Sequence, residues 1–307
     1  MEFSALPFII HIFILAITPP FFLGIIAKTK AFFAGRKGPP LLQVYYDLIK
    51  LFRKGAVYSK TASPLLKVAP VIIVATTFVA GLLLPITGKA PFHFEGDLIL
   101  FAYLLALARF AIILAALDVG SSFEGMGASR EATFGAFSEL AFFLGLVVLA
   151  VTTNALSLNA IFQWESVHPT LKPVFLLLFF SFFLILLTEN SRIPIDDPNT
   201  HLELTMIHEV MVLDYSGPDL GLILYSASMK LFLFMALTTS LLWPQPMEWE
   251  WISIGTLFLK IAGMAVAIGI VESANARLRL IKIPQFLIAN FVVTVFALLV
   301  TVFNKGT

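Results

Sequence analysis

The sequence predicts an all-α, polytopic membrane protein with about eight transmembrane helices, an amphipathic helix on the membrane surface and a structured acidic loop. The chain has 307 residues, of which 59% are hydrophobic and only 13% are charged, and its mean hydropathy is +0.94. A soluble domain of this length is not so apolar. Eight apolar segments are each long enough to cross a bilayer core of about 30 Å. They cover residues 5–27, 67–86, 98–117, 131–150, 173–188, 219–242, 253–272 and 283–303.

The first of these segments begins almost at the N-terminus. It has no basic region before it and no small-residue cleavage site, so we expect a retained helix rather than a signal peptide. No repeat or low-complexity tract divides the chain, and we expect residues 1–307 to form a single integral membrane domain. The fifth segment is short, and Lys172 and Glu189 can extend it by reaching to the interface.

Residues 41–54 predict a surface helix after the first span. Apolar side chains recur at a spacing of three to four residues, and Gln43, Asp47 and Lys50 lie on the opposite face. The segment is too short and too charged to span, so we expect it to lie along the cytoplasmic interface. A basic anchor that only fixes topology is the alternative reading of the same pattern.

The connection before the fourth span is rich in glycine and predicts a flexible turn, after which Arg130 and Glu131 open the helix. Glu131 suits a helix N-terminus electrostatically. Glu139 lies eight residues further on, about 12 Å deeper at 1.5 Å per residue, among aromatic residues. A carboxylate at that depth is costly unless it faces a wet or protein-lined interior.

Four more ionisable residues fall inside apolar spans. They are Arg109, Lys230, Lys260 and Glu272. Several charges of both signs within one bundle favour a polar track that joins helices and carries protons or water. Purely structural ion pairs are the alternative.

The loop 189–218 gathers much of the charge of the protein between two apolar spans. Pro194 and Pro198 exclude a regular helix at its start, whereas the pattern from about 200 to 213 predicts a helix. We interpret the loop as a folded, charge-lined pocket wall at the membrane surface. Its carboxylates are Glu189, Asp196, Asp197, Glu203, Glu209 and Asp214.

The chain offers little for catalysis or metal binding. His201 and His208 are seven residues apart, which is not the i, i+4 spacing of a zinc helix. No phosphate-binding glycine loop or nucleophile constellation is apparent, and there are no cysteines to hold iron–sulfur clusters or a nickel–iron centre. If electron transfer is part of the function of this protein, we expect another chain to carry the electrons. A net charge of +1 gives no reason to expect nucleic-acid binding.

The distribution of basic residues predicts the orientation in the membrane. Of the 20 Lys and Arg residues, 14 lie in alternate loops, 28–67, 118–130, 189–218 and 273–282, and only 3 lie on the other side. We expect these four loops to face the cytoplasm and both termini to lie outside.

Three long motifs resemble one known family. They are GRKGPPLLQVYYDLIKLFRK, GMGASREATFGAFSEL and ENSRIPIDDPNTHLELTMIHEVMVLDYSGPD, in this order on an eight-helix frame. The chain resembles the quinone-site subunit of respiratory NADH dehydrogenase, subunit 1. It is most similar to the relatives of that subunit in energy-converting membrane-bound nickel–iron hydrogenases, including subunit 4 of formate hydrogenlyase.

The resemblance can be carried over residue by residue. Gly35, Arg36, Gly38 and Pro39 match the basic turn of the family before the surface helix with Asp47 and Lys50. Arg130 and Glu139 match the Arg and the deep Glu of the fourth-helix motif. The start and end of the long loop are matched by Glu189, Arg192, Pro194, Asp196, Glu203, Asp214 and Tyr215.

The resemblance implies a membrane anchor and coupling subunit in a prokaryotic cell membrane. The implied partners are hydrogenase large and small subunits and an iron–sulfur subunit on the cytoplasmic side, with a nickel–iron centre and clusters, and antiporter-like subunits in the bilayer. A proton or charge relay would use Glu139, Glu189, Asp196, Asp197, Glu203, Asp214, Lys230, Lys260 and Glu272. Charge-holding or interface residues would be Arg36, Arg130, Arg192, Asp47 and Lys50.

One departure separates this chain from the quinone-reducing branch. That branch has a denser Glu-x-Glu-x-Glu run where this chain has Asp-Asp-Pro-Asn-Thr-His-Leu-Glu, residues 196–203. The difference favours the hydrogenase branch over a quinone-binding NADH dehydrogenase subunit, which is the main alternative. A stand-alone transporter would favour an inverted repeat, which the sequence does not display, and a purely structural anchor is the remaining alternative.

Overall fold

The computed structural model describes residues 5–59, 62–163, 169–196, 206–243 and 251–306, and this part of the chain is helical with no strand. Three short 3-10 helices, η2 (Pro169–Leu171), η3 (Glu209–Val212) and η4 (Leu280–Lys282), lie in the connections. The α-helices are α1 (Ala5–Ile17), α2 (Pro19–Phe33), α3 (Gln43–Phe52), α4 (Leu65–Leu83), α5 (Asp97–Asp118), α6 (Ser122–Thr153), α7 (Leu158–Ile161), α8 (Lys172–Glu189), α9 (Gly217–Leu242), α10 (Trp251–Ala274) and α11 (Ile283–Gly306).

Seven of the described helices are long and apolar enough to cross a membrane, and α1 with α2 form an eighth span that is bent by 44°. The first predicted span, 5–27, is therefore broken within its length and extends further, to Phe33. Pro19 and Pro20 begin α2 and lack the N–H groups that would continue the α1 hydrogen bonds. The hydroxyl of Thr18 donates to the Ile14 carbonyl at 2.8 Å, an interaction often found where helices bend.

Helix α3 lies within the range predicted for the amphipathic surface helix. Only Leu48 is fully buried in it, whereas Tyr46, Ile49 and Phe52 are exposed. The hydroxyl of Tyr45 donates to the Ile17 carbonyl, so α3 is attached to the break between α1 and α2.

Helix α6 begins at Ser122, not at the predicted Arg130–Glu131, and runs for 32 residues. Two of the glycines that suggest a flexible turn, Gly125 and Gly127, are helical residues of its first two turns, whereas Gly120 precedes the helix. Gly127 packs so closely that an added Cβ would lie 2.3 Å from a side-chain carbon of Val210. The glycine there is a packing requirement and not a chain break.

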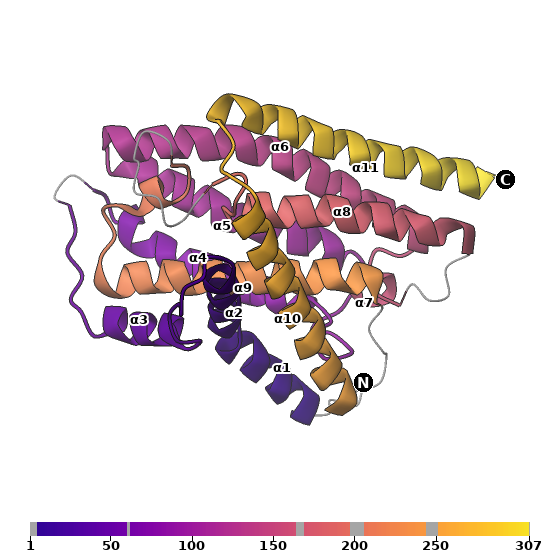
Figure 1. The fold of residues 1–307 in the computed structure, drawn as a ribbon, viewed down its shortest axis with the longest axis horizontal. Helices are drawn as coiled ribbons and strands as arrows, with labels where there is room; N and C mark the ends of the chain where they lie inside the picture. Colours follow the sequence, from indigo (N-terminus) through magenta and orange to yellow (C-terminus); the bar gives the residue numbers. More distant parts are fainter. Residues whose placement is uncertain (1–4, 60–61, 164–168, 197–205, 244–250, 307) are drawn as a thin grey trace.

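Helix α9 lies at the centre of the bundle and packs against α2, α3, α4, α8 and α10. All of its residues from Leu231 to Leu241 are buried. Helix α11 packs along α6 and α8 at one side of the bundle (Figure 1).

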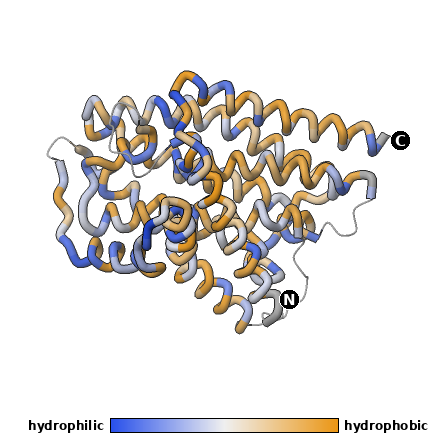
Figure 2. The backbone as a smooth tube through the Cα atoms, in the orientation of Figure 1, coloured by the Kyte–Doolittle hydropathy of each residue, from blue (hydrophilic) through white to orange (hydrophobic). Residues whose placement is uncertain are grey.

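The loops that carry most of the basic residues meet at one end of the bundle. The ion pairs Lys30–Glu272, Arg192–Glu272 and Arg277–Asp196 join the end of α2, the loop after α8 and the α10–α11 connection. Figure 2 shows hydrophilic segments gathered at this end, around α3 and the start of α6, and apolar helices extending away from it. Most of the functional candidates among the described residues lie at this end or just inside it, whereas Lys260 lies farther away, beside Trp243 at the far end of α9.

Candidate functional site

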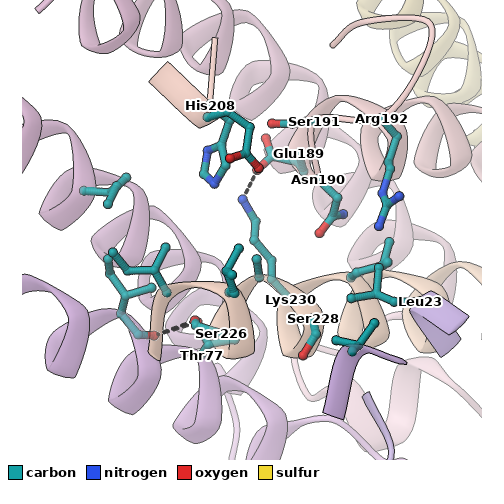
Figure 3. A pocket seen from close by; sticks show the side chains of 18 of the residues that line it. Leu23, Thr77, Glu189, Asn190, Ser191, Arg192, His208, Ser226, Ser228 and Lys230 are labelled. Carbon is teal, nitrogen blue, oxygen red and sulfur yellow. Dashed lines mark hydrogen bonds and ion pairs between the residues drawn. The ribbon is translucent and has the colours of Figure 1, made fainter. Parts of the chain in front are cut away.

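A cavity of about 360 Å³ opens between α2, α3, α4, α5 and α9, under the segment that follows α8. One part of its lining is apolar and includes Leu23, Ile26, Ile73 and Ile112. The other part is charged or polar. Figure 3 shows Glu189, Asn190, Ser191 and Arg192 above the cavity and Lys230 reaching from α9 towards them. The charged and histidine lining residues are Lys30, Asp47, Arg109, Glu131, Glu189, Arg192, His208, Glu209 and Lys230.

Arg109 of α5 is the centre of the charged wall. Its guanidinium pairs with Glu131 at 3.2 Å, with Glu139 at 2.6 Å and with Glu189. Glu131 and Glu139 come from α6 and Glu189 is the last residue of α8, so one side chain joins three helices. The Arg109 side chain is 8% exposed and that of Glu189 is 5% exposed, which limits the screening of these pairs by solvent.

Lys230 completes this cluster from α9. Its ammonium lies 2.9 Å from Glu189, and the hydroxyl of Ser138 donates to the other oxygen of Glu189 at 2.8 Å. We call Arg109, Glu131, Glu139, Glu189 and Lys230 the Arg109 cluster. With every group ionised, three carboxylates face two cations, so the cluster has one negative charge in excess.

Glu139 extends the Arg109 cluster away from the cavity. It does not line the cavity, but shares a void of about 10 Å³ with Arg109, Glu189 and Phe234. A second void of the same size adjoins Arg109, Glu131, Glu189 and Asp196. Each is close to the smallest volume that holds one water molecule. Polar groups and water-sized spaces therefore follow one another from the loop to Glu139, whose side chain is 34% exposed on the outer face of the bundle.

Glu272 organises a second group of charges. Its side chain is fully buried and lies 2.8 Å from Lys30 of α2 and 3.3 Å from Arg192. Lys30 and Arg192 line the cavity, whereas Glu272 does not. The carboxylate therefore positions two cations of the cavity wall from behind it.

The segment after α8 is held by Asp196. The carboxylate pairs with Arg277 at 2.7 Å and accepts hydrogen bonds from the backbone N–H groups of Ile207, at 3.1 Å, and His208, at 3.2 Å. Residues 209–212 form the 3-10 helix η3 rather than the predicted α-helix, which is a correction for the described end of 200–213. Two predicted relay residues, Asp197 and Glu203, lie outside the described residues.

The close contact between Gly127 and the segment 207–211 gives a direct prediction. Replacing Gly127 with Ala should force Val210 and the Ile207 carbonyl away from α6, because an added Cβ would lie 2.3 and 3.1 Å from them. We expect the free energy of unfolding to fall by about 1–3 kcal/mol and the segment 207–211 to be cleaved faster by proteases. Gly125, on the same helix, has nothing within 4 Å of an added Cβ. Gly125→Ala is the matched control and should be neutral or stabilising; equal proteolysis of the two variants would contradict the prediction.

The structure brings some of the remaining predicted residues to the site and leaves others apart. Asp47 lines the cavity and accepts a 3.0 Å hydrogen bond from Gln43. Arg130 donates to the Met206 carbonyl at 2.8 Å and so anchors the backbone of the segment. Arg36 and Lys50 are exposed on the surface around α3.

Lys260 and Asp214 do not join the Arg109 cluster. Lys260 donates to the Trp243 carbonyl at 3.5 Å, and it lies twelve residues before Glu272 on α10, about 18 Å away along the helix axis. The backbone N–H of Asp214 donates to Glu124 of α6 at 3.1 Å. The described residues contain no group of three His, Cys, Asp or Glu side chains that could hold a metal ion.

The roles of three site residues are not predicted from the sequence. Arg109 was identified only as one of several buried charges, and Glu131 was assigned to a helix N-terminus, although both belong to the Arg109 cluster. Lys30 was counted only as a basic loop residue, although it pairs with buried Glu272. The position of Arg109 in an apolar span is the sequence feature that could have identified it. Lys30 has no such feature, because it lies among other basic residues after the first span.

Comparisons with known proteins identify the family and the fold of the chain. Residues 6–303 match the profile of a family described as NADH dehydrogenase. The chain is 31% identical to hydrogenase-4 component C of Escherichia coli, over 88% of this chain and 87% of that protein. It is 29% identical to formate hydrogenlyase subunit 4 of Escherichia coli, over 92% of this chain and 94% of that protein.

Two further similarities are more distant. A subunit of the NADH-quinone oxidoreductase of Rickettsia prowazekii is 28% identical over 67% of this chain and 62% of that protein. A chain in the structure of the membrane-bound sulfane sulfur reductase, an archaeal respiratory membrane complex, superposes with a TM-score of 0.84. That comparison covers 96% of this chain and 98% of the other at 19% identity, and it shows that the fold is shared.

Proposed function

We propose, from the premise that this chain belongs to the NADH dehydrogenase family, that it is the membrane anchor and coupling subunit of a multisubunit oxidoreductase complex of the membrane-bound hydrogenase type. Two relatives that match over at least 87% of both chains are named as a component of hydrogenase-4 and a subunit of formate hydrogenlyase. A soluble arm with the nickel–iron centre and iron–sulfur clusters would dock on the charged end of the bundle, on the cytoplasmic side. Antiporter-like subunits would pack beside it in the membrane and move H⁺ or Na⁺.

The Arg109 cluster is the observation that carries this proposal. Glu131 and Glu189 face the cavity, Glu139 does not, and Arg109 contacts all three. A change of charge at the cavity therefore reaches Glu139 through one guanidinium. Charges that are shielded from water interact much more strongly than charges in water, which suits the cluster to a relay.

The proposed relay runs from the loop to the outer face of α6. A redox step in the arm would change the charge or position of the segment held by Asp196. That change would be felt at Glu189 and Arg109, which share a void with Asp196. Glu139 would pass it to a neighbouring subunit, because its side chain is partly exposed on the surface of this chain. Lys230, Arg192 and Glu272 would set the balance of charge around the cavity.

Isolation of the native complex tests the proposal. An affinity tag at the C-terminal end places the label beyond α11, at the end of the bundle away from α3 (Figure 1). We expect the purified complex to contain nickel, a cysteine-bearing hydrogenase subunit and antiporter-like membrane subunits. A complex that contains flavin and an NADH-oxidising module would contradict the hydrogenase assignment. A chain recovered alone in active form would favour a stand-alone transporter.

The cavity favours one alternative function, that of the quinone-site subunit of an NADH:quinone oxidoreductase. Its volume of about 360 Å³ falls in the range of small-molecule sites. Its apolar side would suit a hydrophobic ring and tail, and Arg109 and His208 offer hydrogen bonds to a polar head. The alternative requires quinone-dependent turnover and tight binding of a quinone-site inhibitor, both of which can be measured on the same purified complex.

A further inference from the structure

Gly135 lies in the interior of α6, beside Arg109 of α5. It is buried, and it comes four residues after Glu131 and four residues before Glu139. Residues that are four positions apart fall on one face of an α-helix. The two glutamates that α6 contributes to the Arg109 cluster therefore share one face of the helix, and the residue between them has no side chain.

The guanidinium of Arg109 lies against the backbone of α6 at Gly135. Its Nη1 donates to the Gly135 carbonyl at 3.4 Å and to Glu139 at 2.6 Å. Its Nε lies 3.2 Å from Glu131. Because the guanidinium lies close to the helix at this point, it reaches the carboxylates about one turn before and one turn after the glycine.

A side chain at position 135 would take the place of the guanidinium. A Cβ added to Gly135 would lie 2.9 Å from Nη1, 3.1 Å from Cδ and 3.2 Å from Cζ of Arg109. These are the three nearest atoms, so the conflict is with this side chain and not with the backbone of a neighbouring helix. Arg109 has little room to move aside, because the voids that adjoin it next to Gly135 and next to Glu139 measure only about 10 Å³ each.

The other glycines of α6 have different neighbours. Gly125 has nothing within 4 Å of an added Cβ, Gly127 packs against Val210, and Gly145 packs against the ring of Phe182. A glycine in the interior of a helix loses more conformational freedom on folding than an alanine does, so it weakens the helix. In this fully described helix, Gly135 is the glycine whose nearest neighbour is a charged side chain.

We propose that Gly135 is a positioning residue, which places Arg109 so that it contacts Glu131 on the cavity side and Glu139 on the outer side at the same time. Nη1 is both the atom nearest to an added Cβ and the donor to Glu139. A side chain at position 135 would therefore weaken the contact between Arg109 and Glu139 in particular. The placement of Arg109 rests on this geometry, whereas the importance of Gly135 for coupling rests on the proposed function.

Chemical labelling of Glu139 in the native membrane complex tests the placement. A carbodiimide reacts with a carboxyl group in its protonated form, and contact with a guanidinium keeps the group ionised. In Gly135→Ala we expect dicyclohexylcarbodiimide to modify Glu139 roughly tenfold faster at neutral pH, the lower end of the effect of one neighbouring cation. Mass spectrometry of the peptide that contains Glu139 measures the rate. Ion transport should also fall relative to the redox turnover of the same sample.

Gly145→Ala is the matched control. It also adds a Cβ to a close contact of α6, 2.5 Å from Cε2 of Phe182, but it meets no charged group. It should lower stability and leave both the labelling of Glu139 and the ratio of transport to turnover unchanged. If Gly135→Ala does not assemble, it is combined with Arg109→Lys. Lysine lacks the Cζ and Nη1 atoms, so the double variant should assemble as well as Arg109→Lys does by itself.

Two results would overturn the inference. Unchanged labelling of Glu139 in an assembled Gly135→Ala complex would show that Arg109 holds Glu139 without needing the glycine. A double variant that fails to assemble, although Arg109→Lys assembles, would show that a side chain at position 135 meets a different group. Faster labelling together with full coupled transport would support the placement of Arg109 and contradict the relay of the proposed function, so the two failures can be distinguished.

Discussion

Replacing Arg109 with Met should destabilise the folded chain by about 3–5 kcal/mol, the range measured when one partner of a buried ion pair is removed. The guanidinium contacts Glu131, Glu139 and Glu189, and without it only Lys230 is left to balance three carboxylates. The net charge of the Arg109 cluster would change from −1 to −2 in a region with little water. The amount of monodisperse complex after solubilisation, and its midpoint of thermal unfolding, measure the effect.

Two further variants test whether the buried charge of Arg109 accounts for the loss of stability. Arg53→Met removes the same charge at an exposed position and should be nearly neutral. Adding Glu189→Gln to Arg109→Met restores the balance of charge and should recover part of the lost stability. An Arg109→Met protein as stable as the wild type would show that the cluster is solvated and does not hold α5, α6 and α8 together.

Replacing Glu139 with Gln should uncouple the complex without stopping its redox reaction. The amide keeps an oxygen that can accept from Arg109, but it cannot carry a proton or a negative charge. We expect the rate of ion transport to fall roughly 100- to 10,000-fold while electron transfer continues, since this is the contribution of one positioned proton-transfer group. The complex reconstituted in vesicles allows both rates to be measured on one sample.

The control variants test separately whether the carboxylate at position 139 and the position of the carboxylate in the proposed relay matter. Glu139→Asp keeps the carboxylate on a shorter side chain and should retain part of the coupling. Asp196→Asn tests the loop end of the proposed relay, and Glu95→Gln removes a carboxylate that is exposed and outside it. Full coupled transport in both Glu139→Gln and Asp196→Asn would rule out the relay, and a loss of assembly alone would favour a purely structural anchor.

Apolar length and periodicity predicted most of the fold. Seven of the eight expected spans correspond to single helices, and α3 lies within 41–54, because burial in lipid or at its surface leaves a pattern in the local sequence. The family resemblance carried by three motifs is confirmed by the match over residues 6–303. The break before Pro19-Pro20 could have been recognised from the same principles, since both residues lack an N–H group.

The centre of the site could not be derived in this way. Glu131, Glu139 and Glu189 are 22, 30 and 80 positions from Arg109, so only the packing of α5, α6 and α8 brings them together. Gly127 looked like part of a flexible turn because the sequence does not show Val210 against it. Lys260 looked equivalent to Lys230, although the two lysines lie at different depths of the bundle. Contacts between distant segments decided each case.

The three simultaneous contacts of Arg109 connect the cavity wall to the outer face of α6. A guanidinium is a rigid plane, so a displacement of Glu131 or Glu189 that tilts it also changes its contact with Glu139. The carboxylates that face the cavity and Glu139 on the outer face of α6 are therefore linked mechanically as well as by charge. Because Arg109 holds Glu139 and Glu189 at the same time, a movement on one side can be passed to the other without any covalent change in this chain.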